Sequence, residues 1–232
     1  LYRQPIEDKD GAPVESVSRE TVWGPVLDDV DYPAGAIAVS RIAHRPEGLN
    51  LSLLRLESAG SVAEALDIAN TIAMPPQNFV VGDAAGNIGW TIAGAIPRKR
   101  GFDAMVPSDW SAAHGWQGWL EPHEYPRIVN PESGRIWTAN ARVTDGDALR
   151  RIGDGGYDLG ARAKQIRDAL FARDTFSPED MLAIQYDDRA LFLAPWRELL
   201  LGLLDTDAAR GDAELAEYRD LVAEWNPRAA PD

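Results

Sequence analysis

Residues 134–143, GRIWTANARV, contain the side chain that ordinary structure explains least well. Two residues that favour strands, Ile136 and Trp137, precede Asn140, a residue type that strands disfavour. Two interpretations are open. Asn140 begins a turn, in which its side chain bonds its own backbone. Alternatively, its amide is a hydrogen-bond donor aimed at an oxyanion that develops during a reaction.

Other patterns that could carry chemistry are weak. The stretch GDAAGNIGW lacks the glycine spacing and the following helix of a phosphate-binding loop, and we find no Gly-x-Ser-x-Gly elbow. The acidic pairs Asp28-Asp29 and Asp187-Asp188 are interpreted as solvated loop charges rather than as an acid–base couple. The three histidines show no metal-ligand spacing; they are His44, His114 and His123.

Tryptophan offers a further pair of alternatives. Four of the eight tryptophans could line an apolar substrate pocket, but aromatic packing in a core is the simpler interpretation. These four residues are Trp90, Trp110, Trp116 and Trp119.

Composition excludes several classes of protein. The formal net charge of −14 argues against a nucleic-acid partner and against an anionic membrane surface, because both need a basic face. Without cysteine there is no disulfide, thiolate nucleophile or cysteine-based metal site. No segment approaches the roughly 18 apolar residues of a membrane helix. The chain starts with the polar segment LYRQPIEDKDG and without Met, so we expect it to be a piece of a longer protein.

Hydrophobic patterning predicts a β-rich first half followed by helices, an α+β organisation. The first half is expected to begin with a hairpin in 1–31 and a short buried strand in 34–43. A helix over 61–73 should then start in a capping box of Ser61 and Glu64. A hairpin in 77–97 and a long tryptophan-rich loop over 98–134 should follow. The second half is expected to contain helices over 161–172, 177–187, 196–205 and 213–225.

Several motifs, taken together, resemble the penicillin acylase family of N-terminal nucleophile hydrolases. The resemblance begins at PPQNFVVGDAAGNIGWTIAGAIPRKR (75–100) and continues in GWQGWLEPHEYPRIVNPESGRIWTANARV (115–143). It extends to RETVWGPVL (19–27), LGARAKQIRDAL (159–170) and PEDMLAIQYDDRALF (178–192). Each motif alone is weak, whereas their common order along the chain is specific.

The resemblance implies part of a four-layer αββα sandwich. In that family a precursor cuts itself into an α chain and a larger β chain, so residues 1–232 are expected to be an internal fragment of one β-chain domain. Residues 1–145 would be mainly strands and the tryptophan-rich loop, and residues 146–232 mainly helical. The expected partners are the α chain, the remainder of the β chain and a small-molecule amide substrate. The resemblance also suggests a periplasmic or secreted protein.

The resemblance also assigns roles to residues. The family's nucleophile is an N-terminal Ser whose own amine is the base, and it would lie outside this chain. Asn140 matches the amide that stabilises the oxyanion, and Arg162 matches an arginine that orients the site. Trp23 and Trp137 are expected to contact substrate.

No cofactor is expected to be required, although some members of the family bind a structural calcium. Asp103 and Asp154 are the candidate oxygen ligands for such an ion.

This sequence departs from the family's pattern in three places. Trp23 stands where the family more often has His, and Ala141 follows Asn140 where many members have a second Asn. Leu1 is not a nucleophile, so the fragment alone is expected to be inactive.

The expected function is hydrolysis of a linear amide with a hydrophobic acyl group, of the penicillin or N-acyl homoserine lactone type. The alternative is a non-catalytic, acylase-like protein that holds an apolar ligand in its tryptophan loop. A third interpretation is a structural interaction module whose apolar surfaces are covered by an absent α chain.

Overall fold

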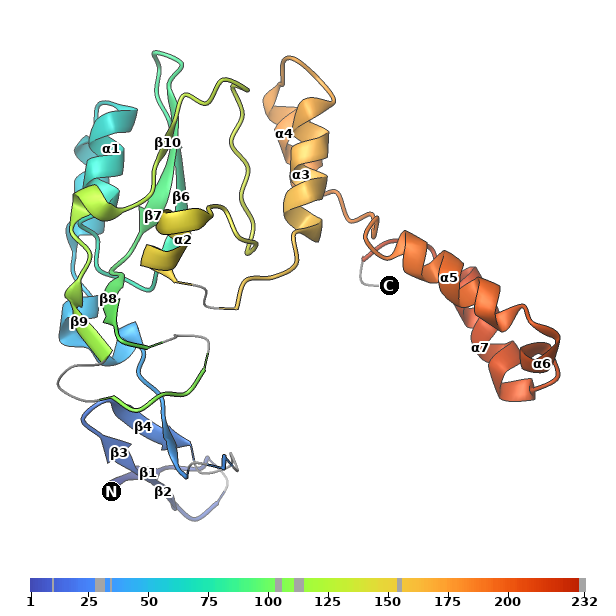
Figure 1. Ribbon diagram of the computed structural model, residues 1–232, viewed down its shortest axis with the longest axis horizontal. Coiled ribbons are helices and arrows are strands. Elements are labelled where there is room, and N and C mark those ends of the chain that lie inside the picture. Colours follow the sequence, from blue (N-terminus) through green and yellow to red (C-terminus); the bar gives the residue numbers. More distant parts are fainter. Residues whose placement is uncertain are drawn as a thin grey trace. The chain divides into compact units, whose positions relative to one another are not determined.

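The computed structural model describes residues 1–9, 11–27, 32–33, 35–102, 106–110, 115–153 and 156–229. The chain divides into two compact units. The first unit is Leu1–Ile136 with Arg142–Asp158, and the second unit is Trp137–Ala141 with Leu159–Asp232. Strands and helices are mixed, as the α+β prediction requires (Figure 1).

The strands among the described residues all belong to the first unit. They are β1 (Tyr2–Ile6), β2 (Val14–Ser18), β3 (Glu20–Thr21), β4 (Gly24–Leu27), β5 (Ile37–Ala38), β6 (Gln77–Gly82), β7 (Ile88–Ala93), β8 (Pro97–Arg100), β9 (Gly115–Trp119) and β10 (Ile128–Val129). The α-helices are α1 (Val62–Ala69) and α2 (Gly146–Ile152) in the first unit, and α3 (Ala161–Phe171), α4 (Pro178–Gln185), α5 (Ala194–Leu204), α6 (Asp207–Arg210) and α7 (Ala213–Glu224) in the second.

The N-terminal part is built from short antiparallel strands. β1 pairs with β2 as the predicted hairpin, and the order of the next sheet is β3-β4-β5. The buried strand predicted over 34–43 is reduced to β5, whose two residues are only half-buried. β5 pairs with β4 over two residues, after which the chain turns into a short 3-10 helix (Ile42–His44).

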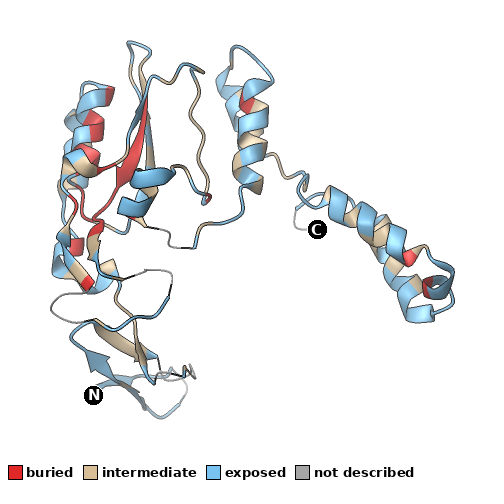
Figure 2. Ribbon diagram, in the orientation of Figure 1, coloured by how far each residue is buried: buried red, intermediate tan, exposed pale blue. Residues whose placement is uncertain are grey.

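β7 is the central strand of the sheet β10-β7-β6 and holds the core of the first unit (Figure 2). Its alternate side chains serve two faces, as strand geometry requires. Trp90 and Ile92 pack with Ile96, Leu120, Tyr125 and Ile152. Ala93 packs with Ala69 and Ile72 on the face that α1 covers.

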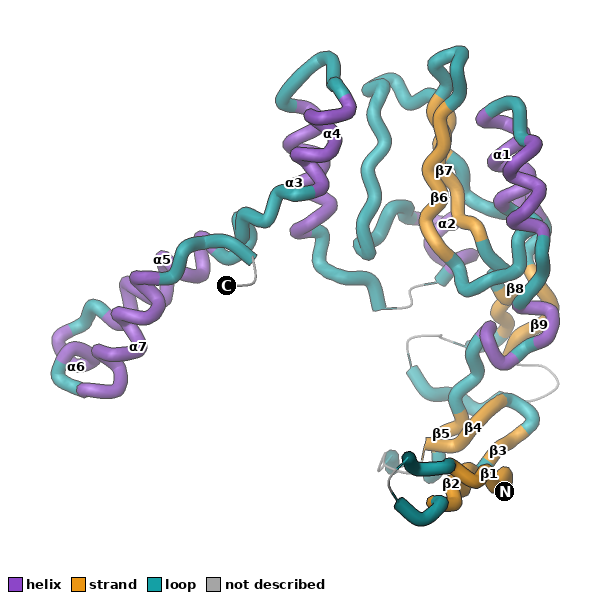
Figure 3. Tube along the Cα trace, turned by 180° about the vertical axis from the view of Figure 1, so that it is seen from behind, coloured by secondary structure: helices purple, strands orange, loops and turns teal. Residues whose placement is uncertain are grey.

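The helix α1 lies directly against β7, and both views of the chain show the two side by side (Figure 3). The close approach occurs at Gly89, where a Cβ atom would stand 2.6 Å from Val62 Cγ1 and 3.0 Å from Leu66 Cδ1. Val62 and Leu66 are both buried. The absence of a side chain at position 89 therefore lets the helix sit on the strand.

The turn between β6 and β7 is held by one carboxylate. Asp83 Oδ1 accepts hydrogen bonds from the backbone N–H groups of Ala85 and Asn87, both at 3.0 Å. Asp83 Oδ2 accepts a further bond from Val62 N, the first residue of α1, at 3.2 Å. Hydrogen bonding from Asn87 lowers the pKa of Asp83. The tight hairpin predicted from GDAAGN is confirmed, and its turn also caps the helix.

The N-cap of α1 is Ser61, as predicted, but only half of the predicted capping box forms, and the helix ends early. Ser61 Oγ accepts a hydrogen bond from Glu64 N at 3.2 Å, while the Glu64 carboxylate bonds Gly60 N, one residue before the position that a capping box uses. The helix ends at Ala69, four residues earlier than predicted. The next residue, Asn70, is the C-cap, and its side chain bonds the Ile92 carbonyl of β7.

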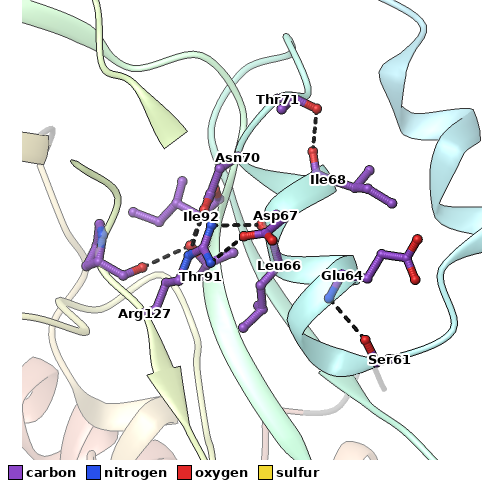
Figure 4. A network of polar contacts seen from close by, with 11 residues as sticks. Ser61, Glu64, Leu66, Asp67, Ile68, Asn70, Thr71, Thr91, Ile92 and Arg127 are labelled. Carbon is purple, nitrogen blue, oxygen red and sulfur yellow. Dashed lines mark hydrogen bonds and ion pairs between the residues drawn. The ribbon is translucent and has the colours of Figure 1, made fainter. Parts of the chain in front are cut away.

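A buried polar network fixes α1 against β7 (Figure 4). Asn70 Nδ2 donates to Thr91 Oγ1 at 2.9 Å and to the Ile92 carbonyl at 3.0 Å. The Asn70 Oδ1 atom accepts from Arg127 Nε at 2.9 Å and also from Arg127 Nη2. Arg127 Nη1 pairs with Asp67 at 2.7 Å. Because Asn70 and Thr91 are both buried, each needs these partners.

The long loop predicted over 98–134 contains regular structure. β8 and β9 form an antiparallel pair with an irregularity between Pro97 and Lys99, and β10 joins the sheet beside β7. A 3-10 helix (Pro122–Glu124) lies between them and is held by Glu124, whose carboxylate pairs with Arg98 at 2.6 Å. The Glu124 carbonyl accepts from Arg151 of α2 at 2.8 Å. The loop prediction was wrong because its strand partners are distant in sequence.

The helices of the second unit follow the predicted pattern. Ser177 and Asp180 form a reciprocal capping box at the start of α4, with Pro178 as its first residue. α5 packs against α7 and α6, and the short α6 was not predicted. None of the helices in the described part of the chain combines the length and apolar character needed to cross a membrane.

We predict that Arg127→Met destabilises the protein by about 1–3 kcal/mol, because the buried oxygen of Asn70 loses its donor. The matched control is Arg55→Met, since among the described residues the Arg55 side chain bonds only the exposed Thr71 hydroxyl, at 3.5 Å. The control should change stability by no more than about 0.5 kcal/mol. The measurement is the free energy of unfolding in urea. Equal losses in both variants would contradict the role of the network.

The Arg98–Glu124 pair predicts a pH dependence of stability. Its hydrogen bonds lower the pKa of Glu124 from an ordinary 4.5 to about 2. A carboxylate whose pKa is lowered on folding stabilises the fold above its unfolded value, so this contribution is lost as the pH falls from 4.5 towards about 2. Urea midpoints measured between these pH values should fall more steeply for the wild type than for Glu124→Gln. Parallel curves for the two proteins would show that the pair does not contribute.

Candidate active site

The chain that carries Asn140 is irregular rather than a strand. Gly134, with φ +64°, closes a turn in which its N–H bonds the Pro131 carbonyl at 2.8 Å. Residues 135–139 then belong to no helix or strand, and Asn140 lies in a bend. The predicted strand through Ile136 is absent: Ile136 packs on the core of the first unit, and in 135–141 only Ala141 is a β-bridge residue.

The structure brings Asn140 and Arg162 together within the second unit. Arg162 Nη2 donates a hydrogen bond to Asn140 Oδ1 at 2.7 Å. Arg162 is the second residue of α3, which follows Gly160 at its N-cap. Both side chains are exposed, so the pair lies at the surface of the second unit.

This hydrogen bond decides what the amide of Asn140 can do. Arginine has only donors, so it can bond the oxygen end of a carboxamide and not the nitrogen end. The Asn140 Nδ2 atom has no hydrogen-bond partner among the described residues, and its two N–H groups remain available. An amide held in this way donates to an incoming oxyanion without changing its own charge.

Electrostatics at the start of α3 favour an anion. The N-terminus of a helix is the positive end of its dipole, and a cation there is unfavourable by roughly 0.3–1 kcal/mol. The first turn of α3 contains Arg162 and no acidic residue. The positive end of the helix dipole and the guanidinium group of Arg162 therefore both lie near the Asn140 amide.

The two tryptophans predicted to contact substrate lie in different units. Trp137 is half-buried, and its ring packs edge-on against Phe171 with centroids 5.8 Å apart and an interplanar angle of 79°. Trp23 lies in the turn between β3 and β4, where it is 39% exposed and its backbone N–H donates to Thr21 Oγ1 at 3.2 Å. Substrate contact by either residue stays a prediction. Phe171, whose ring contacts Trp137, is not predicted from the sequence, because no motif marks it.

The tryptophan-rich region divides between core and surface. Trp90 is buried, and its indole N–H bonds Asn78 Oδ1 at 2.9 Å, as core packing predicts. The other three form a row of tilted rings with Phe102, at centroid distances of 5.2, 5.7 and 6.2 Å; the row is Phe102, Trp110, Trp116 and Trp119. Arg45 lies over the Trp116 ring at 5.9 Å.

Neither proposed calcium ligand can be placed, because Asp103 and Asp154 lie outside the described residues. Among the residues that the structure does describe, no group of three or more His, Asp or Glu side chains could hold a metal ion. The calcium site stays a prediction.

The acidic pairs do not form an acid–base couple where they can be seen. Asp187 pairs with Arg189 at 2.7 Å, and this hydrogen bonding holds the pKa of Asp187 far below its usual range. Asp188 pairs with Arg228. Asp28 and Asp29 lie outside the described residues. The visible pair is thus bound to arginine side chains rather than simply solvated.

Comparison with known proteins gives one family. The family model described as Penicillin amidase matches residues 2–232. Penicillin acylase 2 proenzyme of a Pseudomonas species is 30% identical over 229 residues, which is 97% of this chain and 29% of that protein. The acyl-homoserine lactone acylase QuiP of Pseudomonas aeruginosa is 25% identical over 195 residues, covering 78% of this chain and 23% of that protein.

A solved structure supports the expected fold class. The thermostable penicillin G acylase from Alcaligenes faecalis matches all of this chain and 42% of its own chain, with a TM-score of 0.64 and 24% identity. This likeness confirms an N-terminal nucleophile hydrolase fold. The chain spans less than a third of the length of the curated relatives that it matches.

Proposed function

Because this chain belongs to the penicillin amidase family, we propose that it is part of an amidohydrolase that cleaves linear amides with a hydrophobic acyl group. The observation that carries the proposal is the 2.7 Å hydrogen bond from Arg162 to Asn140 Oδ1. It holds the amide with its N–H groups available, as an oxyanion donor requires. The names of the relatives support two substrate classes, penicillins and N-acyl homoserine lactones.

The proposed reaction uses a nucleophile from outside this chain. An N-terminal Ser attacks the amide carbonyl, and its own α-amine takes the proton; an α-amine has a pKa near 8, so about a tenth of it is free base at neutral pH. The carbonyl oxygen becomes an oxyanion, to which Asn140 Nδ2 donates. The α-ammonium gives this proton to the departing amine as the acyl-enzyme forms, and water then cleaves the acyl-enzyme, releasing the acid and restoring the Ser hydroxyl. Arg162 holds the oxygen of the Asn140 amide, so that the N–H groups of the amide face the oxyanion.

The same proposal includes partners and location. The α chain and the rest of the β chain would come from the same precursor and supply the nucleophile. The family resemblance favours a periplasmic or secreted protein. A structural calcium would be held by oxygen ligands, for which Asp103 and Asp154 are the candidates. The rival interpretation, a non-catalytic ligand-binding relative, gives no reason for an arginine to hold an exposed amide at the positive end of a helix.

We predict that Asn140→Ala in the product of the complete gene lowers kcat by about 10²–10³-fold, the usual effect of losing one oxyanion donor. Asn140→Asp should be at least as damaging, since a carboxylate keeps the oxygen facing Arg162 but repels the oxyanion. The matched control is Asn226→Ala, which removes another exposed amide and should leave kcat unchanged. Full activity of Asn140→Ala would disprove the role.

The masses and N-terminal residues of the product of the complete gene separate the enzyme from its rival. We expect two chains, the larger of which begins with Ser or Thr and contains these 232 residues. A single uncut chain would instead support the ligand-binding relative.

A further inference from the structure

The helices α5 and α7 form a hairpin that its own contacts hold together, and both views of the chain show the two helices side by side (Figures 1 and 3). At its base, residues 188–190 pair with residues 227–229 through an antiparallel β-bridge and two backbone hydrogen bonds of 2.8 and 2.9 Å. Near the base, Arg197 of α5 donates to two carbonyls in the last turn of α7, at 2.7 and 3.1 Å. At the other end of α5, Asp205 pairs with Arg219 of α7 at 3.0 Å. The two helices are therefore fixed to each other within residues 188–229.

An apolar groove runs between these two helices on one face of the hairpin. Its volume is about 310 Å³. Two of the large side chains that line it, Trp196 and Leu221, are 59% and 61% exposed. The apolar lining is Leu193, Trp196 and Leu200 on the α5 side, with Leu221, Val222 and Trp225 on the α7 side. Contiguous exposed apolar surface of this kind marks a site of interaction, so we expect the groove to be covered.

Acidic side chains follow the α7 edge of the groove. Glu214, Glu217 and Glu224 lie on one line along the helix with Leu221, at successive spacings of three and four residues. All three glutamates are exposed, and their carboxylates form no ion pair with any residue in the described part of the chain. The edge of the groove therefore carries negative charge that the hairpin itself does not neutralise.

The dimensions and the charge of the groove indicate what fits it. α5 has 11 residues and α7 has 12, so each helix is about 16–18 Å long. A groove between two helices of this length accommodates a third helix of about three turns, whose apolar face packs between their side chains. The acidic edge favours a helix with lysine or arginine beside its apolar face, because opposite charges at a rim steer the partner and fix its register.

The length of the related proteins indicates where such a helix comes from. This chain covers only 29% of the Penicillin acylase 2 proenzyme. The solved penicillin G acylase matches the whole chain, this hairpin included, with 42% of its own chain. More than half of each of these proteins thus lies outside the matched part. This favours a cover from the same precursor over a second copy of this chain.

We propose that the groove between α5 and α7 is the docking site of an amphipathic helix with a basic flank, and that this helix belongs to a part of the same precursor outside residues 1–232. The inference rests on the part of the proposed function that gives this chain partners from one precursor. It adds the surface on which one of them docks and the chemistry of the segment that docks there.

Photo-cross-linking in the product of the complete gene identifies the cover. Tyr218 is exposed one turn before Leu221 and Val222, and p-benzoylphenylalanine in its place keeps an aromatic ring at the edge of the groove. The peptide captured on irradiation should come from the same gene product but from outside residues 1–232. Capture only of peptides from residues 1–232, which a second copy would give, would overturn the inference. Capture of no peptide would overturn it too.

Thiol labelling tests the cover without a foreign residue. In the folded product of the complete gene, a maleimide should label Leu221→Cys at least about tenfold more slowly than in the same protein unfolded in urea, because the covering helix must first move away. Mass spectrometry of the labelled peptide gives the rate at this position alone. Equal rates in the two states would mean that the groove is open, and would overturn the inference.

Charge reversal tests the basic flank. Glu217→Lys combined with Glu224→Lys should speed the labelling of Leu221→Cys by at least about twofold, since like charges at the rim weaken docking. Glu198→Lys is the control, because Glu198 is exposed on α5 and does not line the groove. A rate that the double substitution leaves unchanged, or that the control raises equally, would overturn the basic flank. None of these readouts depends on turnover, so the proposed function stands or falls separately with the activity of Asn140→Ala.

Discussion

A carboxamide has one accepting end and one donating end, so the group that bonds its oxygen also decides where its N–H groups point. In the described part of the chain, an arginine side chain bonds an asparagine oxygen at two separate sites. Arg127 does so for the buried Asn70, whose Nδ2 is then spent on Thr91 and the Ile92 carbonyl. Arg162 does so for the exposed Asn140. The same interaction completes the core in one place and leaves a donor available in the other.

The two networks place different demands on the chain. The Asn70 network joins α1, β7 and the residues before β10, and each buried polar atom in it has a partner. The contact of Asn140 with α3 is made at the surface of the second unit, by a residue that the helix dipole disfavours. Stability therefore explains the first arrangement, whereas the second is better explained by chemistry.

Local signals were read well from the sequence, and distant partners were not. Ser61 and Ser177 start helices where a side-chain oxygen meets a free N–H group, a relation that spans three residues. The sequence predicts loop where β8 and β9 form, because each strand pairs with a partner that the local pattern does not reveal. For the same reason, the sequence predicts a strand at Ile136, although this residue lies in an irregular segment and packs against the core. Arg162 was linked to Asn140 by family resemblance alone, whereas Phe171 had no motif to mark it.

The glycine at position 89 also limits how far this sequence can vary. It has no positive φ, so its backbone conformation is open to any residue, and only the contact with Val62 and Leu66 excludes a side chain. A side chain at this position would require Val62 or Leu66 to shift. Gly86 lies in the turn between β6 and β7, and no atom stands within 4 Å of a Cβ added there. Its φ of +86° is what disfavours other residue types at this position. Glycine at position 89 thus provides room for the neighbouring helix, whereas glycine at position 86 provides the backbone conformation of the turn.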